Sequence, residues 1–284
     1  MHQPLDSPLD QIIAGGFAPV RWQLWPRDTF RVVDWNINRG LRLTRVIEFL
    51  QSCRADLILL QEVDSNARRT HHLDVAREIA QALKMNYVFA REFQELTQGS
   101  RLSPAYHGQA TLSAWPLSNP RILRFQKQSN FWRPHWFVPE ISPFQERIGG
   151  RLALVVEAKV ADKTIVTYNL HLESKGDDEL RCSQLDESFS DARHYDANRP
   201  ILLAGDLNID ASQGPAAGAI TRAHFLDAFA NQHVTTRPAH SVLDHGRIID
   251  WILTRGPARA RRPQVHCSVA GSDHFPLSID LDFA

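Results

Sequence analysis

The chain has 284 residues, and 32 Lys and Arg side chains balance 32 Asp and Glu, so the formal net charge is zero. This balance excludes a strongly basic protein whose overall charge would draw it to nucleic acid or anionic membranes. Hydrophobic residues make up 43% of the chain, which is typical of a globular protein and excludes a disordered or fibrous one. We expect one large α/β domain with a sizeable core.

Residues 1–28 contain several prolines and glycines without a regular hydrophobic period, so we interpret them as an extension that precedes a domain at 29–284. The start of the chain lacks the features of a secretory signal, and no run of about 18 apolar residues could span a membrane. The three cysteines (Cys53, Cys182 and Cys267) are widely spaced, which disfavours both a disulfide framework and a thiolate metal site. These features favour a cytoplasmic protein.

The predicted elements alternate between strands and helices. A strand from Phe30 to Ile37, helical spacing from Leu43 to Leu50 and an apolar run at 57–60 predict two parallel strands joined by a helix. Further helices are predicted from about Leu73 to Leu83 and from about Asp177 to Tyr195. The other strands are predicted at 87–90, 109–114, 121–125, 151–160, 164–171, 201–206, 248–253 and 276–281.

Polar residues stand where these strands end or begin. They form six short motifs: Trp35-Asn36-Ile37-Asn38, Leu60-Gln61-Glu62-Val63, Tyr168-Asn169-Leu170-His171-Leu172, Gly205-Asp206-Leu207-Asn208, Ile249-Asp250-Trp251 and Gly271-Ser272-Asp273-His274. The directions of the predicted strands bring all six motifs to one edge, where ligands bind outside the strand ends of α/β sheets. One motif alone would more often be a turn, a cap or a solvated charge, so only their convergence indicates a site.

These residue types suit hydrolysis of a phosphate ester, which needs an activated water, charge relief on the phosphate and help for the leaving oxygen. Glu62 offers a hard oxygen ligand of the kind that Mg²⁺ or Mn²⁺ takes in proteins. Asp206 could orient and deprotonate the water, with Asn208 donating its amide to the phosphate. His171 could stabilise charge or donate a proton to the leaving group.

The remaining motif residues have supporting roles in this interpretation. The ring of His274 needs a partner that fixes its tautomer. Asp250 could supply that partner, while Asp273 could support the imidazole or stay near the metal and the water. Asn36 and Asn169 are short amides at strand ends, suited to holding carboxylates and imidazoles in place.

Together the six motifs resemble the endonuclease/exonuclease/phosphatase superfamily along residues 30–282. The resemblance implies a four-layer α/β/β/α sandwich, with two packed mixed sheets and helices on both outer faces. It also implies a Mg²⁺- or Mn²⁺-dependent phosphoester hydrolase whose catalytic domain spans 29–284. Its implied catalytic residues are His171, Asp206, Asn208, Asp250, Asp273 and His274, and its implied metal ligands are Asn36, Glu62 and Asp273.

Asn169-Leu170-His171 is similar to the branch of pancreatic-type deoxyribonucleases, sphingomyelinases, inositol-polyphosphate phosphatases and tyrosyl-DNA phosphodiesterases. The stretch from His107 to Ser113 matches the family's Gly-x-Ala-x-Leu-Ser pattern, but Gln109 stands where asparagine is common among nucleases. We expect a phosphodiesterase or nuclease acting on nucleic acid or phospholipid, with Gln109 near the substrate or supporting the site. The alternatives are a phosphomonoesterase acting on a lipid headgroup, inositol or nucleotide phosphate, and a non-catalytic binding protein.

Two further segments carry charged residues. The segment 126–149 is longer than the resemblance predicts and interleaves aromatic residues such as Phe131 and Trp132 with basic ones. Strand direction places it over the site, where it could form a substrate wall or fold back as a satellite core. A basic cluster follows the strand that begins at Asp250, and we interpret it as a solvated turn; it consists of Arg255, Arg259, Arg261 and Arg262.

Overall fold

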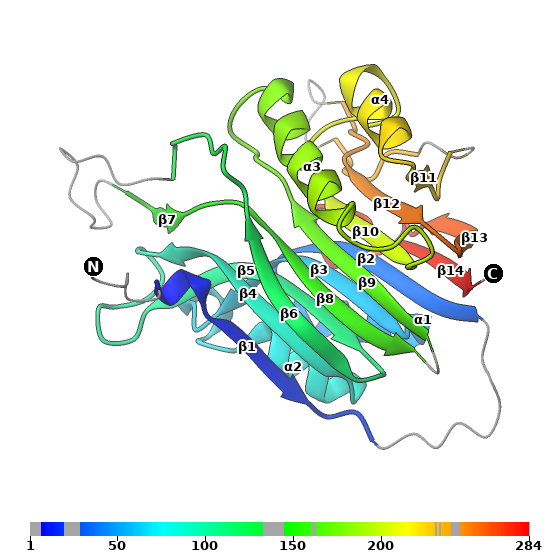
Figure 1. Cartoon of the computed structure of the whole chain (residues 1–284). Coiled ribbons are helices and arrows are strands. Elements are labelled where there is room, and N and C mark those ends of the chain that lie inside the picture. Colours follow the sequence, from blue (N-terminus) through cyan, green and yellow to red (C-terminus); the bar gives the residue numbers. More distant parts are fainter. Residues whose placement is uncertain are drawn as a thin grey trace, which may run out of the picture.

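The computed structural model describes residues 7–19, 29–132, 145–160, 163–230, 232, 234–239 and 245–283. Within these residues two mixed β-sheets pack face to face, and helices cover both outer faces (Figure 1). The predicted four-layer sandwich is therefore confirmed.

The first sheet has eight strands in the order β1-β4-β5-β3-β2-β14-β13, with the short β7 also paired to β4. Parallel pairing of β2 and β3 follows from the helix α1 (Leu43–Cys53) that connects them. Helix α2 (Val75–Leu83) packs beside α1, and the apolar faces of both helices belong to the core of this sheet. The strands are β1 (Ile12–Gly16), β2 (Thr29–Arg39), β3 (Leu57–Ser65), β4 (Asn86–Glu95), β5 (Ala105–Ser113), β7 (Arg147–Gly149), β13 (Ala258–Val265) and β14 (Leu277–Phe283).

The second sheet has six strands in the order β11-β12-β10-β9-β8-β6. Its outer face is covered by α3 (Asp178–Ala192) and α4 (Gly214–Arg222), which bury Leu185, Phe189 and Ala219 against it. Its strands are β6 (Leu117–Arg124), β8 (Leu152–Val160), β9 (Lys163–His171), β10 (Ile201–Asp206), β11 (Leu226–Asp227) and β12 (Asp250–Arg255). Two short 3-10 helices complete the fold: η1 (Pro8–Asp10) and η2 (Arg68–Thr70).

An edge strand, β1, lies inside the segment interpreted from sequence as an N-terminal extension. It pairs antiparallel with β4, from Ile12 opposite Ala90 to Gly16 opposite Asn86. Part of the extension is therefore integrated into the first sheet. The strand was not predicted because two of its five residues are glycines, which are depleted in strands.

The interpretation of the basic cluster as a solvated turn was wrong. Arg255 is the half-buried last residue of β12 and donates to the carbonyl oxygen of Ala192 at 2.7 Å. Arg259, Arg261 and Arg262 lie in β13, which pairs antiparallel with β14 at the sheet edge. Arg261 and Arg262 form ion pairs with acidic residues of β14. Charged side chains are a common protection for edge strands, and their density concealed the strand pattern.

Candidate active site

Three candidate residues form a row across the second sheet. In the register of the strands, Asp206 at the end of β10 lies opposite His171 of the parallel β9 and opposite Asp250 of the antiparallel β12. Gly205 makes this close approach possible, because a Cβ atom there would lie 1.9 Å from the carbonyl oxygen of Leu170, and its φ is +145°. The backbone itself therefore aligns these side chains.

Asp206 is the centre of the cluster. Its Oδ2 accepts a hydrogen bond from the side-chain amide of Asn36, at 3.1 Å. The same oxygen lies 3.8 Å from Nε2 of His171 and 3.8 Å from Nε2 of His274. Its Oδ1 accepts a hydrogen bond from the backbone N–H of Asn208 at 2.9 Å, which fixes the carboxylate in an Asx turn.

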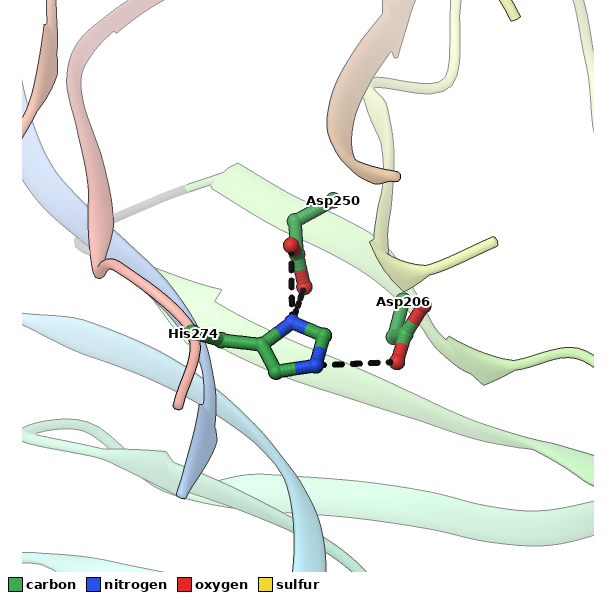
Figure 2. A group of neighbouring side chains, drawn as sticks. All are labelled: Asp206, Asp250 and His274. Carbon is green, nitrogen blue, oxygen red and sulfur yellow. Dashed lines mark hydrogen bonds and ion pairs between the residues drawn. The ribbon is translucent and has the colours of Figure 1, made fainter. Parts of the chain in front are cut away.

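His274 is held by Asp250. Both carboxylate oxygens of Asp250 lie 2.9 Å from Nδ1 of His274, so Nε2 is directed toward Asp206 (Figure 2). Burial lowers the pKa of His274, but the carboxylates of Asp250 and Asp206 outweigh it and raise this pKa to about 10. Of the two partners left open by the sequence, Asp250 is the one that orients the ring.

Asp273 takes a different position. Its carboxylate accepts a hydrogen bond from the hydroxyl of Ser272 at 3.2 Å and lies 3.9 Å from the guanidinium of Arg237. It is half-buried, and it does not belong to the compact group of Asp206, Asp250 and His274.

His171 has two buried partners that sequence reasoning missed. Nη1 of Arg151 lies 2.8 Å from Nδ1 of His171, and Oε2 of Glu92 lies 3.2 Å from the same atom. A guanidinium can only donate, so a neutral His171 accepts this bond at Nδ1 and carries its proton on Nε2. A protonated His171 donates from Nδ1 to Glu92 and still carries a proton on Nε2. In either state an N–H is directed toward Asp206.

Glu92 is itself a buried charge. Burial raises its pKa, but His171 and Arg151 outweigh this effect and lower the pKa to about 2. The predicted strand ended at residue 90, whereas β4 continues to Glu95, and nothing in the local pattern indicated that a charged strand residue would face the site. Likewise, nothing in the local sequence indicated that Arg151, at the start of a predicted strand, would contact His171.

Glu62 leaves the regular ladder through a distortion in β3. The pairing of β3 with both neighbours shifts beside Glu62, and the residue has a left-handed φ of +51°. Its side chain is 22% exposed and lies 3.9 Å from Arg39. Burial raises the pKa of Glu62, but the imidazoles of His107 and His171 and the charge of Arg39 lower it well below its usual range. Glu62 therefore presents an ionised carboxylate near the end of β3. Its left-handed backbone and the irregular pairing beside it are typical of functional positions.

Asn169 and Gln109 lie between the sheets, and both are fully buried. The Asn169 amide donates to the carbonyl oxygens of Leu60 at 3.1 Å and Ala110 at 2.9 Å, both in the first sheet. The Gln109 amide donates to the carbonyl oxygen of Leu152 at 3.0 Å, in the second sheet. These two side chains connect the sheets beneath the site, and Gln109 supports the interior rather than presenting itself to solvent.

Asn208 follows Asp206 at the end of β10 and has a left-handed φ of +52°. Its side-chain amide donates to the carbonyl oxygen of Leu172 at 3.2 Å. One of its two amide hydrogens is used in this way, which leaves the other for a ligand at the site.

Thr236 is a third residue that the sequence did not indicate. Its hydroxyl accepts hydrogen bonds from the backbone N–H groups of Ile249 at 3.0 Å and Asp250 at 3.1 Å. Its carbonyl oxygen accepts a 2.7 Å bond from the N–H of Phe275. Thr236 thus joins the segment that carries Asp250 to the segment that carries His274.

A metal ion has two possible sets of ligands. Asp206, Asp250 and His274 could hold one, since their ligand atoms all lie within 4.8 Å of one another. The paired bonds between Asp250 and Nδ1 of His274, however, already satisfy that ring nitrogen. The ionised carboxylate of Glu62 is the alternative, because it is the kind of hard oxygen ligand that Mg²⁺ or Mn²⁺ takes in proteins.

The two described aromatic residues of the segment 126–149 differ in burial. Trp132 is buried, donates from Nε1 to Glu173 at 3.0 Å and packs on Phe93 with ring centroids 5.2 Å apart. Phe131 is 58% exposed. The other aromatic residues of 126–149 lie at 133–144, outside the described residues.

Among the described residues, none of the helices has the length and apolar character of a membrane span.

The chain is 26% identical over 187 residues to the inositol phosphosphingolipids phospholipase C of Schizosaccharomyces pombe. That match covers 62% of this chain but only 38% of the yeast protein.

Solved structures show the same fold. An endonuclease/exonuclease/phosphatase from Beutenbergia cavernae superposes with a TM-score of 0.67 at 19% identity, over 91% of this chain and 72% of that one. A protein of the same description from Bacteroides vulgatus gives 0.67 at 15% identity, over 91% of this chain and 100% of that one. TDP2 from Caenorhabditis elegans superposes with a TM-score of 0.60 at 18% identity, over 90% of this chain and 75% of that one. Residues 35–274 match the endonuclease/exonuclease/phosphatase family, and the chain therefore belongs to that family of phosphoester hydrolases.

Proposed function

We propose that the chain hydrolyses phosphodiesters with Mg²⁺ or Mn²⁺, using a water activated by Asp206. The observation that carries the proposal is the convergence on one carboxylate oxygen of two imidazole nitrogens, each 3.8 Å from Oδ2 of Asp206. A base flanked by two N–H donors is the arrangement needed to deprotonate water beside an anionic phosphate.

Asp206, His274 and His171 have different roles in the proposed reaction. Asp206, held by Asn36 and by the backbone of Asn208, accepts the proton of the attacking water. His274, protonated by its pairing with Asp250, directs Nε2–H at a phosphate oxygen. His171 directs its own Nε2–H from the neighbouring strand, to stabilise charge or protonate the leaving oxygen.

A divalent cation bound by Glu62, with Asn36 and Asp273 near it, would relieve negative charge on the phosphate. The chemistry of these oxygen donors supports Mg²⁺ or Mn²⁺ over zinc, which prefers nitrogen and sulfur ligands. The group of Asp206, Asp250 and His274 is the alternative location.

A diester is favoured over a monoester by the phospholipase C relative, because a phospholipase C reaction breaks a phosphodiester. The second candidate is a phosphomonoesterase that acts on a lipid headgroup, inositol or nucleotide phosphate. A non-catalytic binding protein is disfavoured because both imidazoles, of His171 and His274, lie 3.8 Å from Asp206 and close enough to Glu62 to lower its pKa.

Turnover of a chromogenic phosphodiester and the matching monoester, each with Mg²⁺ and with a chelator, tests the proposal. We expect metal-dependent cleavage of the diester that Asp206→Asn abolishes. Cleavage of the monoester alone would favour the second candidate, a phosphomonoesterase. Cleavage that is unchanged in Asp206→Asn would remove this site from the reaction.

A further inference from the structure

Five loops surround the candidate site, and four of them follow a strand that carries a site residue. We call 40–42, 66–72, 96–104, 126–132 and 174–176 the rim loops. The first two follow β2 and β3, which carry Asn36 and Glu62. The third follows β4, which carries Glu92, and the fifth follows His171 of β9. The fourth lies between β6 and β7, and β6 ends at the same side as β9 because both strands are antiparallel to β8. All five therefore border the same opening.

Contacts between the loops join them into one surface. The loop 66–72 is bonded to the loop 96–104, since the N–H of Arg68 donates to the carbonyl oxygen of Gln98 at 2.9 Å. On one side, Gly40 to Arg42 and Arg69 to His71 line a common pocket. On the other, the ammonium of Lys175 lies 5.5 Å from the ring centroid of Phe131. Figure 1 shows β7 and the turn between β4 and β5 at the same end of the molecule.

Large apolar side chains are exposed on this surface. Leu102 is 98% exposed, Phe131 58% and Leu41 50%, and each lies on a different rim loop. In the part of the chain that the structure describes, only two other large hydrophobic residues are exposed: Leu226 on β11 and Val234. A single exposed leucine needs no explanation, but three around one catalytic opening indicate an interaction surface.

The charge of the rim loops has one sign. They contain six cationic side chains and no Asp or Glu, although the whole chain has equal numbers of both signs. One cation, Arg69, is neutralised by its ion pairs with Asp64 and Glu95. The nearest acidic residues after the last loop begin α3, where Asp177 caps the helix and Asp178 pairs with Arg181. The six cations are Arg42, Arg68, Arg69, Arg101, Lys127 and Lys175.

Each exposed apolar residue also has a cation beside it. Arg42 follows Leu41, Arg101 precedes Leu102, and Lys175 faces the ring of Phe131. Such pairs suit a bilayer surface, where the apolar part enters the boundary of the acyl chains and the cation remains among anionic headgroups. A soluble polyanion would account for the cations but would leave the apolar groups without a partner.

We propose that the rim loops dock the protein on an anionic membrane surface and present the phosphodiester of a membrane lipid to Asp206. The docking surface stands on its own observations, and the assignment of a lipid phosphodiester as substrate rests on the proposed function. Apolar burial supplies one part of the attraction, and the cations supply a second part that salt weakens.

Binding to vesicles tests the docking without turnover. The full chain would be mixed with vesicles of phosphatidylcholine, with and without phosphatidylserine, in the presence of a chelator, and the bound fraction measured by sedimentation. We expect binding that requires phosphatidylserine and falls as salt is raised. Leu102→Ser should lower the partition coefficient about tenfold, the effect of losing one largely buried leucine. Leu226→Ser is the matched control, because Leu226 is 67% exposed but lies on β11, outside the rim loops. This variant should bind vesicles like the unmodified protein.

Three results would overturn the docking: no vesicle binding, equal loss in Leu102→Ser and Leu226→Ser, or binding to a DNA duplex in place of vesicles. Leu102→Ser should turn over a soluble chromogenic diester at the unmodified rate and hydrolyse vesicle phospholipid more slowly. If the soluble diester is cleaved but vesicles are not bound, the proposed function stands and the docking falls. If vesicles are bound but no diester is cleaved, the docking stands and the proposed function falls.

Discussion

Oδ2 of Asp206 lies 3.8 Å from Nε2 of His274, although Asp206 belongs to one sheet and His274 to the loop that leads into the other. Asp206 ends β10 of the six-stranded sheet, whereas His274 precedes β14 of the eight-stranded sheet. This arrangement of side chains therefore exists only when the two sheets are packed against each other. Interactions that hold the sheets in register are as necessary to the site as the residues that meet substrate.

Asp206→Asn should lower the turnover of the chromogenic diester by about 10²–10⁴, the contribution of a positioned general base. The amide is of similar size, so circular dichroism and the denaturation midpoint should change little. Asp186→Asn is the control, because Asp186 is exposed on α3 away from the site. Equal rates for both variants would show that Asp206 is not the base.

Asp250→Asn should change how activity depends on pH. In the unmodified protein the pKa of His274 is raised from 6.5 to about 10, so the ring stays protonated through neutral pH. Without the carboxylate of Asp250 the pKa of His274 falls, and the variant should lose activity at a lower pH than the unmodified protein. Titration of the ring nitrogens by ¹⁵N NMR in metal-free protein measures both pKa values. An unchanged titration would contradict the pairing.

The same pair makes stability depend on pH. Because the pKa of His274 is higher in the folded protein than its ordinary value of 6.5, the stabilisation is fully present below pH 6.5. It is lost progressively as pH rises from there through about 10. Urea denaturation of metal-free protein across this range should show a decline that is smaller in Asp250→Asn. A decline of equal size in both proteins would assign it to other groups.

Glu62→Gln should raise the Mg²⁺ concentration for half-maximal activity by at least about tenfold, since it removes a charged ligand. Chelation should abolish the activity of the unmodified protein, and Mg²⁺ should restore it. Glu48→Gln, exposed on α1, serves as the control. Rescue by Zn²⁺ alone would contradict a site built from oxygen ligands.

Asn169→Ala should lower the free energy of unfolding by about 2–4 kcal/mol, because the buried carbonyl oxygens of Leu60 and Ala110 lose a donor. Urea denaturation measures the loss, with the exposed Asn198→Ala as the control. Because Asn169 acts beneath the site, the folded variant should keep most of its affinity for Mg²⁺. Full stability combined with lost metal binding would place Asn169 in the site itself.

The sequence by itself predicted most of the strands, three of the four α-helices in the described residues and the position of the polar motifs at strand ends. These features are local: apolar periodicity predicts a strand or a helix, and the direction of parallel strands follows from the helix between them. Asn36, Glu62, His171 and Asp206 could be assigned to one edge on that basis alone. The strands β1 and β13 were missed because glycines in β1 and arginines in β13 concealed the alternating pattern of a strand.

Only the tertiary structure decided which side chains are partners. Asp250 and Asp273 were equal candidates for His274 in the sequence, and the packing of β12 against the segment before β14 selected Asp250. Glu92 contacts His171 from β4 and Arg151 contacts it from the residue before β8, and no local pattern connects them. Hydrogen bonds depend on separations of a few ångströms between distant segments, and these are set by sheet register and packing rather than by the periodicity of any one segment.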